Sequence, residues 1–529
     1  MIHLGSRAQQ ISRQDSLRGA ITPERAWWDL LHYDIDVEVD IPGQSLTGKN
    51  TIRYKVLEAS RPMQVDLMDG MRLIKAEQNG SSLPFSKEEN AYLLQTPAMQ
   101  PGEIHEVTLF FQGKPRVSTQ PPWDPGFVWV KDRKQKDFVA NANQATGPAL
   151  WLPSKNHPYD EPDQGMDIRI TAEESLVSVA NGRLVEKTSR KQGKNTYHWQ
   201  VTNPINGYGI NINIGDYVHF GEKFEGEKGV LDCDYYVLSY NLDKAKTQFR
   251  QAAQMLKAFE HWFGPYPFYE DSFKLVEVPY LGMEHQSSVT YGNGYRNGFH
   301  GSDQSNTGWG MKFDFIIIHE AGHEWFANNI TNKDVADMWM HESFTTYSEV
   351  LYLDYTFGKQ AGNEYLVGYR SKVQNDRPII GPYNVYRTGS TDMYIKGAAM
   401  IHTLRQVIND DEAFRQLLRG INRDFYHQTL SSAELEAYIS EKTGLDLAGF
   451  FEQYLRTTKV PELQYTIKNG VLSYRYRNTV ENFNIPLRVF AGKEELWLHP
   501  GQNWQTIDLS AKDAELLIDE NFYVVLVKK

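Results

Sequence analysis

Apolar and polar residues alternate over long stretches between residues 30 and 220. Clear examples are Ile35, Val37 and Val39, and then Ile52, Tyr54 and Val56. Period-two alternation between turn residues indicates strands that bury one face. We therefore predict a large N-terminal domain that is antiparallel and sandwich-like.

The period changes near residue 243. Helical spacing relates Phe249, Ala252, Leu256, Phe259 and Phe263. Gly264-Pro265 is expected to end this helix, and Ser431 with Glu434 is a capping-box pattern for a later one. The region up to about residue 457 is thus predicted to be rich in helices.

Strand alternation returns after Pro461, where Asn469-Gly470 separates two alternating runs. This dipeptide favours a hairpin because both residues tolerate positive φ. We predict a small C-terminal β-sandwich, so the expected fold is multidomain α+β. The predicted domains are residues 1–222, 223–457 and 458–529.

Length, charge and cysteine content narrow the possibilities. A chain of 529 residues is too long for one hydrophobic core. Its net charge of −12 argues against a nucleic-acid partner, and we find no apolar run of about 18 residues for a membrane span. The single cysteine, Cys233, excludes an intrachain disulfide and a cysteine-rich zinc module, and we expect it to be a buried, inert thiol.

The N-terminus lacks the apolar core of a signal peptide. The polar start and near absence of cysteine favour an exported, mature chain. We therefore expect a soluble protein that is periplasmic or secreted, with a cytoplasmic location as the alternative.

The segment from His319 to His323 carries the clearest chemistry, His-Glu-Ala-Gly-His. Four residues make about one helical turn, so both imidazoles point the same way and can bind one zinc ion. Glu320 lies beside them, in a position that suits a general base for a zinc-activated water. A catalytic zinc needs a third protein ligand, and Glu342 is the candidate, because a turn near residues 332–334 would return it to the pair.

Two neighbours of Glu342 remain open. His341 is a rival ligand, although a supporting or surface role is favoured. Glu349 lies on the same helix face as Glu342, where it either orients a ligand histidine or is a plain solvated residue.

Further motifs resemble the gluzincin zinc aminopeptidases, the family typified by aminopeptidase N and leukotriene-A hydrolase. Leu281-Gly282-Met283-Glu284-His285 stands where the family has Gly-x-Met-Glu-Asn. The resemblance implies that Glu284 binds the free amine of the peptide and that Gly282 and Met283 contact the substrate. His285 departs from the family's Asn, which puts the first side-chain pocket in doubt.

Two more segments carry the resemblance. The run from Gln144 to Pro153 resembles the segment that follows the family's amine-contacting residue, so Gln144 is implied as a second amine contact. Tyr394-Ile395-Lys396-Gly397 resembles the family's Tyr-x-Lys-Gly, which implies that Tyr394 donates to the oxyanion. The catalytic residues are thus expected to be Glu320 and Tyr394, within a thermolysin-like domain.

The expected function is removal of the N-terminal residue from peptides that have a free amine. The large helical C-terminal domain of many members is expected to be absent, which would leave a more open cleft. The alternatives are a zinc endopeptidase, a bifunctional peptidase and epoxide hydrolase, and an inactive scaffold. Glu284 argues against the endopeptidase, and the intact motifs argue against the scaffold.

Overall fold

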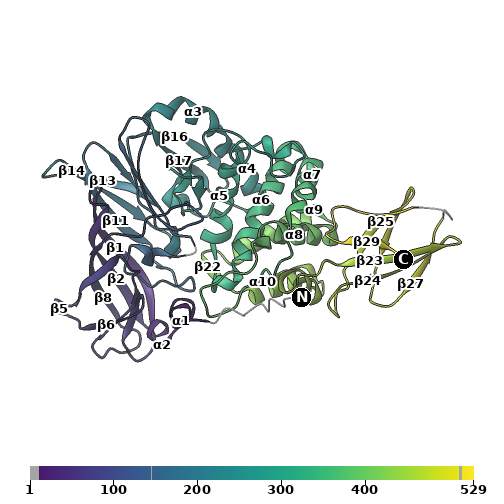
Figure 1. The fold of residues 1–529 in the computed structure, drawn as a ribbon, viewed down its shortest axis with the longest axis horizontal. Coiled ribbons are helices and arrows are strands. Elements are labelled where there is room, and N and C mark those ends of the chain that lie inside the picture. The colour runs from purple at the N-terminus through teal and green to yellow at the C-terminus, as the bar shows by residue number, and fades with distance from the viewer. Residues whose placement is uncertain (1–10, 145, 511–514) are drawn as a thin grey trace, which may run out of the picture.

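The computed structural model describes residues 11–144, 146–510 and 515–529. A β-rich N-terminal part, a helical middle part and a C-terminal β part follow one another along the long axis (Figure 1). This α+β order agrees with the prediction.

The N-terminal part is built on an eight-stranded sheet of order β13-β14-β11-β1-β2-β8-β4-β5. Its strands are β1 (Trp28–Asp40), β2 (Ser45–Val56), β4 (Met71–Gln78), β5 (Ser81–Ser82), β8 (Ile104–Gly113), β11 (Met166–Glu173), β13 (Arg183–Arg190) and β14 (Lys194–Val201). Along β1, Ile35, Val37 and Val39 are buried, as their alternation predicts.

The prediction that this domain is antiparallel is wrong at one pair. Strands β1 and β11 run parallel, with Tyr33 opposite Met166 and Glu38 opposite Thr171. A parallel pair needs a long crossover between its strands. Here the intervening chain forms strands of its own, and alternation along one strand does not report the direction of its neighbour.

Two smaller sheets complete this part, of orders β12-β15-β10-β9 and β3-β7-β6. Their strands are β3 (Met63–Asp66), β6 (Phe85–Glu88), β7 (Ala91–Leu94), β9 (Gly126–Lys131), β10 (Asp137–Ala142), β12 (Val177–Val179) and β15 (Asn213–Gly215). The loops that follow β8 and β10 extend towards the helical part and contribute to the site described below.

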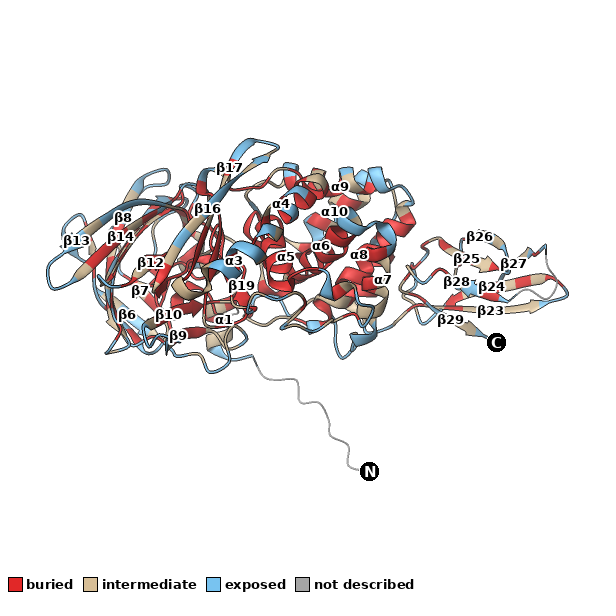
Figure 2. Ribbon diagram, turned by 90° about the horizontal axis from the view of Figure 1, so that it is seen from above, coloured by how far each residue is buried: buried red, intermediate tan, exposed pale blue. Residues whose placement is uncertain are grey.

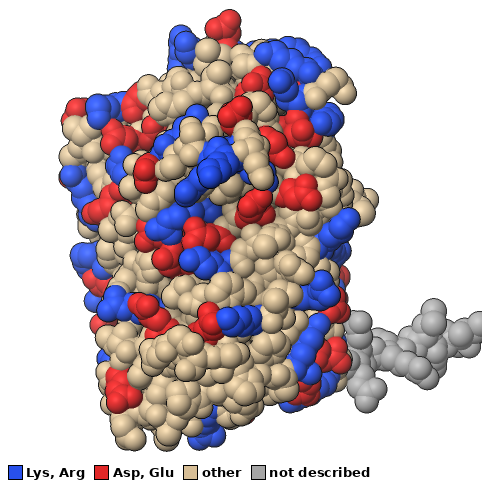
Figure 3. All heavy atoms as spheres, turned by 90° about the vertical axis from the view of Figure 1, so that its left-hand side faces the viewer, with Lys and Arg blue, Asp and Glu red and all other residues tan. Residues whose placement is uncertain are grey.

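The outer face of the N-terminal part, viewed in Figure 3, carries acidic and basic side chains interspersed. Ion pairs between neighbouring strands account for part of this pattern, such as Arg169 with Asp34 and Lys49 with Asp36. Surface pairs of this kind contribute little to stability. They do mean that this face is not a continuous basic surface of the kind that binds nucleic acid.

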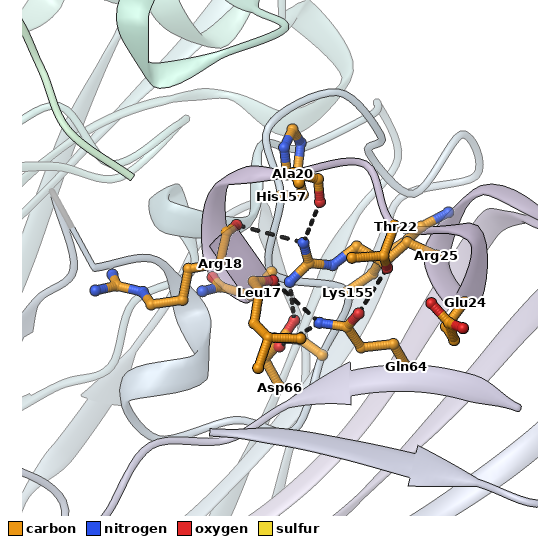
Figure 4. A network of polar contacts seen from close by, with 12 residues as sticks. Leu17, Arg18, Ala20, Thr22, Glu24, Arg25, Gln64, Asp66, Lys155 and His157 are labelled. Carbon is orange, nitrogen blue, oxygen red and sulfur yellow. Dashed lines mark hydrogen bonds and ion pairs between the residues drawn. The ribbon is translucent and has the colours of Figure 1, made fainter. Parts of the chain in front are cut away.

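The N-terminal helices α1 (Arg13–Gly19) and α2 (Pro23–Ala26) lie against this domain. The guanidinium of Arg25 is fully buried and pairs with Asp66 at 2.6 Å (Figure 4). Arg25 also donates to the carbonyl of Ala20 at 2.7 Å, and Gln64 donates to the carbonyl of Leu17 at 3.2 Å. These contacts hold the two short helices against the N-terminal domain.

The middle part combines a five-stranded sheet, of order β16-β17-β18-β20-β19, with most of the helices. The strands are β16 (Tyr217–Gly226), β17 (Gly229–Leu238), β18 (Phe273–Glu277), β19 (Gly282–Met283) and β20 (Val289–Tyr291). The helices are α3 (Leu242–Gln248), α4 (Arg250–Phe263), α5 (Phe315–Gly322), α6 (Trp339–Phe357), α7 (Lys359–Tyr369), α8 (Ile395–Ile408), α9 (Asp411–Asp424), α10 (Ser432–Thr443) and α11 (Ala448–Arg456). A short parallel pair, β21 (Ile330–Asn332) with β22 (Gln428–Leu430), lies beside them.

Local signals within this part agree with the structure. Helix α4 ends at Gly264, whose φ of 94° suits glycine, and Ser431 with Glu434 forms the capping box of α10. Helices α5 and α6 are buried along most of their length (Figure 2), which makes them the centre of the core. Cys233 is buried on β17, as expected.

The C-terminal part contains two sheets, of orders β27-β24-β23-β29 and β26-β25-β28. Their strands are β23 (Glu462–Lys468), β24 (Val471–Arg477), β25 (Leu487–Ala491), β26 (Glu494–Leu498), β27 (Gln505–Asp508), β28 (Leu516–Ile518) and β29 (Val525–Lys528). Asn469 and Gly470 both have positive φ and connect β23 with β24, as the hairpin signal predicts. No helix among the described residues is both long enough and apolar enough to cross a bilayer.

Candidate active site

Two helices bring three predicted ligands together. His319 and His323 lie one turn apart at the end of α5, and Glu342 lies in the first turn of α6. Glu342 Oε2 is 3.4 Å from His323 Nε2 and 3.9 Å from His319 Nε2. The ligand atoms of all three lie within 4.8 Å of one another, so a single ion can contact them all.

Helix α5 begins at a strongly held cap. The side chain of Asp314 accepts from the backbone N–H of Ile316 at 3.2 Å, and the hydroxyl of Tyr291 donates to it at 2.8 Å. The helix ends at His323, and Ala327, with φ of 147°, lies in the irregular turn that follows. This turn lets the chain reverse towards α6.

Hydrogen bonds set the tautomer of both histidines. The Nδ1–H of His319 donates to Glu349 Oε1 at 2.7 Å, and the Nδ1–H of His323 donates to the carbonyl of Phe326 at 3.1 Å. Each Nε2 faces Glu342 and would be the nitrogen available to a metal ion. Glu349 is fully buried, so the solvated alternative for this residue is excluded.

The donor atoms of His319, His323 and Glu342 are suited to binding a metal ion. Glu342 Oε2 is buried without a hydrogen-bond partner among the described residues, whereas Oε1 accepts from Tyr394 and Gln144. A buried carboxylate oxygen with no donor is costly. A cation between this oxygen and the two imidazole nitrogens would remove that cost, and two His with one Glu is a donor set of catalytic zinc.

His341 does not join the cluster. It is buried, and its Nε2 accepts from the backbone N–H of Asn332 at 2.9 Å. That contact occupies the nitrogen that could bind a metal, and burial lowers the pKa of the ring to about 3. The residue is a structural support for the turn before α6.

Glu320 and Tyr394 line the same cavity as the three ligands. Burial raises the pKa of the Glu320 carboxyl to about 7. Tyr394 precedes α8, and its hydroxyl donates to Glu342 Oε1 at 2.8 Å. Burial also holds the pKa of this tyrosine well above its ordinary value, so the hydroxyl stays a proton donor.

The predicted amine contacts meet across two parts of the chain. Gln144, in the loop after β10, donates from Nε2 to Glu284 Oε1 at 2.9 Å and to Glu342 Oε1 at 3.2 Å. Glu284 follows β19, where Gly282 approaches α5 so closely that an added Cβ would lie 2.6 Å from a methyl group of Ile316. Met283 is buried and lines the cavity beside Gly282.

His285, the departure from the family motif, is fully buried and is not among the residues that line this cavity. Its Nδ1 lies 3.4 Å from Thr290 Oγ1, and burial lowers its pKa to about 3. The substitution therefore acts inside the protein and leaves the carboxylate of Glu284 in the cavity.

The cavity has about 710 Å³ of empty space, which includes solvent at its open side. The remaining wall residues were not predicted as site residues from the sequence: Pro122, Trp123, Leu281, Phe299, Phe315, Thr346 and Tyr369. Phe315 stacks on His319 with ring centroids 5.0 Å apart. Only a signal of tertiary proximity could have identified this set.

Comparison with known proteins indicates which family this chain resembles. The family model for the peptidase family M1 domain matches residues 247–454. This range includes the metal cluster, by which we mean the three proposed ligands His319, His323 and Glu342, and also Glu284 and Tyr394. This match confirms the resemblance to the gluzincin aminopeptidases.

Relatives along the chain are distant. A leucyl aminopeptidase of Saccharolobus solfataricus is 20% identical over 459 residues, which cover 82% of this chain and 56% of that protein. Human aminopeptidase B is 25% identical over 369 residues, covering 64% of this chain and 53% of that protein. The chain thus spans about half the length of these curated relatives.

Solved structures share the fold. An M1 zinc metallopeptidase from Deinococcus radiodurans superposes with a TM-score of 0.71 at 21% identity, over 82% of this chain and 95% of that one. A two-domain M1 zinc metallopeptidase bound to L-tryptophan gives 0.70 at 22% identity, over 82% and 96%. The N-terminal β-rich and helical parts therefore form the architecture of two-domain M1 metallopeptidases.

Proposed function

We propose that this protein is a zinc aminopeptidase that removes the N-terminal residue from peptides. The observation that carries the proposal is the contact between Gln144 Nε2 and Glu284 Oε1, 2.9 Å, in the cavity that also holds the metal cluster. A carboxylate close to the reacting bond binds the ammonium group of the substrate. Binding there places the peptide bond that follows the first residue at the site of reaction. The related structure with a bound Tyr-Ser-Ala substrate is consistent with peptide binding in this fold.

The metal would be held by His319, His323 and Glu342, whose free Nε2 and Oε2 atoms converge. A zinc ion there would act as a Lewis acid that polarises the scissile carbonyl and makes a water molecule acidic near neutral pH. Glu349 would orient His319 through the bond to Nδ1.

Glu320 is proposed as the general base. Its buried carboxylate would take a proton from the attacking water and transfer it to the leaving amine. Burial raises the pKa of this carboxyl above its ordinary value, which makes it a better proton acceptor.

Tyr394 is proposed to stabilise the oxyanion. Its hydroxyl now donates to Glu342 Oε1, at 2.8 Å, and lies at the cavity wall. If the Tyr394 hydroxyl donated to a substrate oxygen instead, Glu342 Oε1 would still accept from Gln144. No buried polar group would therefore be left unpaired by this exchange.

A panel of aminoacyl-arylamides and their N-acetylated twins tests this function. We expect cleavage of the free-amine substrates only, loss of activity on chelation and recovery with zinc. Equal cleavage of the acetylated twins would favour the endopeptidase alternative and remove the anchoring role of Glu284. Absence of cleavage on every substrate, with zinc bound, would favour the scaffold, whereas no observation favours an epoxide hydrolase.

The finer divisions of the chain are also proposals. We propose a thermolysin-like catalytic domain that follows the N-terminal domain and a separate C-terminal β domain from residue 458. The pairing of β16 with β17 supports moving the first boundary from residue 222 to before Tyr217. A periplasmic or secreted location is proposed from the scarcity of cysteine.

A further inference from the structure

Trp123 is unusually exposed for a large apolar residue. Its exposed fraction is 67%, the highest among the large hydrophobic residues that the structure describes as exposed. It lies in the loop between β8 and β9, in the N-terminal part of the chain. The same residue lines the cavity that contains His319 and Glu342, in the helical part.

The loop around Trp123 is well ordered by its neighbour Asp124. Asp124 Oδ2 accepts from the backbone N–H of Thr119 at 2.9 Å and from its hydroxyl at 2.8 Å. The N–H of Asp124 donates to the carbonyl of Gln120 at 3.0 Å, and Arg116 forms an ion pair with the carboxylate. These contacts hold the backbone next to Trp123, so the loop itself needs little further ordering when the indole meets a ligand.

An exposed indole at the mouth of a cavity has a large unsatisfied apolar surface. A tryptophan can bury roughly 150–250 Å² and is enriched where proteins bind other molecules. Scattered exposed apolar residues need no explanation, but one placed at a built cavity with a rigid backbone is an available binding contact.

The position of Trp123 relative to the amine contacts indicates which part of a peptide it meets. A second cavity, of about 510 Å³ of empty space, also includes Gln144 and is lined by Tyr208, Val335 and Met338. This second cavity contains neither Trp123 nor the metal cluster. Gln144 therefore borders both cavities, while Trp123 borders only the cavity that holds His319, His323 and Glu342.

We propose that Trp123 is a specificity-determining residue that packs against a large apolar side chain on the second residue of the peptide, the first residue of the released product. This inference rests on the proposed aminopeptidase function. The walls that accompany Trp123 support the apolar class. Leu281 and Phe299 are apolar, and the titratable Glu and His residues that line the cavity are the proposed metal ligands, Glu320 and Glu284.

Tripeptides with alanine in first position and Gly, Leu, Phe or Lys in second position provide the test. The proteins are wild type, Trp123→Ala, Trp123→Phe and, as a control, Trp504→Ala, which alters an exposed tryptophan just before β27 in the C-terminal part. We expect Trp123→Ala to lower kcat/KM about tenfold for Leu and Phe in second position, mainly through KM, and to leave Gly unchanged. Trp123→Phe should retain most of the preference, and Trp504→Ala should equal wild type.

Three results would overturn the proposal. They are an equal loss for every second residue, a loss for Lys that exceeds the loss for Phe, and a loss that follows the first residue in a parallel series of Xaa-Gly-Gly peptides. Thermal melting of each variant separates these results from misfolding.

A failure of the proposed aminopeptidase function can be distinguished from a failure of the proposal for Trp123. If zinc-loaded wild-type protein cleaves none of the peptides, the aminopeptidase proposal fails. Calorimetric binding of the Ala-Phe-Ala and Ala-Gly-Ala peptides to zinc-loaded Glu320→Gln protein then still decides the role of Trp123. A preference for Ala-Phe-Ala that Trp123→Ala removes supports the packing role, and equal affinities, or a preference unchanged by Trp123→Ala, overturn it.

Discussion

Gln144 Nε2 lies 2.9 Å from Glu284 Oε1, although the two residues are 140 positions apart in the chain. The amide comes from the N-terminal β-rich part, and the carboxylate follows β19, the edge strand of the sheet in the middle part. The proposed anchor for a substrate amine is therefore assembled only when the two parts pack together. Any change in their packing should alter amine binding before it alters the metal cluster, which lies within α5 and α6.

Removal of the carboxylate in Glu284→Ala should abolish the selection for a free amine. Loss of one partner from a buried charge pair commonly costs 2–5 kcal/mol, so kcat/KM for free-amine substrates should fall at least about thirtyfold. Residual cleavage of N-acetylated peptides should not fall. The ratio of the two activities measures the effect, and an unchanged ratio would contradict the role of Glu284.

Tyr394→Phe should lower kcat and leave zinc content unchanged. An oxyanion donor typically contributes about 10²–10³ in kcat. The variant keeps the aromatic ring that lies against His319, with centroids 6.1 Å apart, so the local packing is preserved. Steady-state kinetics with metal analysis provides the check, and a change confined to KM would point to substrate packing instead.

Glu349→Ala should weaken zinc binding about 10–100-fold, because the Nδ1–H of His319 would lose its acceptor. Competition with a chelating indicator measures this affinity. Tyr365→Phe is the matched control, since the Tyr365 hydroxyl contacts the other oxygen of Glu349 and leaves the bond to His319 intact. Equal affinities in wild type and Glu349→Ala would show that His319 needs no support.

Arg25→Met should destabilise the protein by about 3–5 kcal/mol, because the carboxylate of Asp66 would stay buried without its cation. Chemical denaturation monitored by fluorescence measures the change. Arg13→Met is the control: Arg13 pairs with Glu88 at the surface, where both side chains are exposed, and no measurable change is expected. Similar losses in both variants would contradict the importance of burial.

Glu161 provides a prediction for pH. Burial raises its pKa from 4.5 to about 8, and Thr331 Oγ1 donates to its Oε1 at 2.6 Å. The folded state thus retains a proton that the unfolded chain releases above about pH 4.5. Stability from this group is complete below that pH and is lost as the pH rises through about 8.

Glu161→Gln keeps the oxygen that accepts from Thr331 and removes the titration. Denaturation between pH 5 and 9 should show the variant gaining on wild type as the pH rises. Parallel stability curves for the two proteins would exclude this contribution from Glu161.

The sequence predicted features that depend on neighbours in the chain. The pair His319 and His323 needs one helical turn, and the hairpin at Asn469-Gly470 needs two residues that tolerate positive φ. The third ligand was reachable because only a short segment, which contains β21, separates Glu342 from the first pair. The alternation in β1 predicted which of its residues are buried, for the same local reason.

Other features depended on which distant segments meet. Alternation could not distinguish a parallel from an antiparallel neighbour for β1, because both bury the same face. Glu349 was undecided between a solvated and a buried role, because its burial depends on how α6 packs. Trp123 carried no motif, and the departure at His285 looked like a change in the pocket until its burial inside the protein was known.

The sequence by itself determined which residues are proposed for the chemistry of the site, namely the His-Glu-Ala-Gly-His helix, the carboxylate of Glu342 and the motif around Tyr394. Tertiary structure alone decided the contact of Gln144 with Glu284, the tautomers of the two histidines and the placement of Trp123 at the cavity. The physical reason is the range of the forces that act. Helix periodicity and turn preferences operate over a few residues, whereas long-range contacts follow from burial of the whole apolar surface, to which every segment contributes.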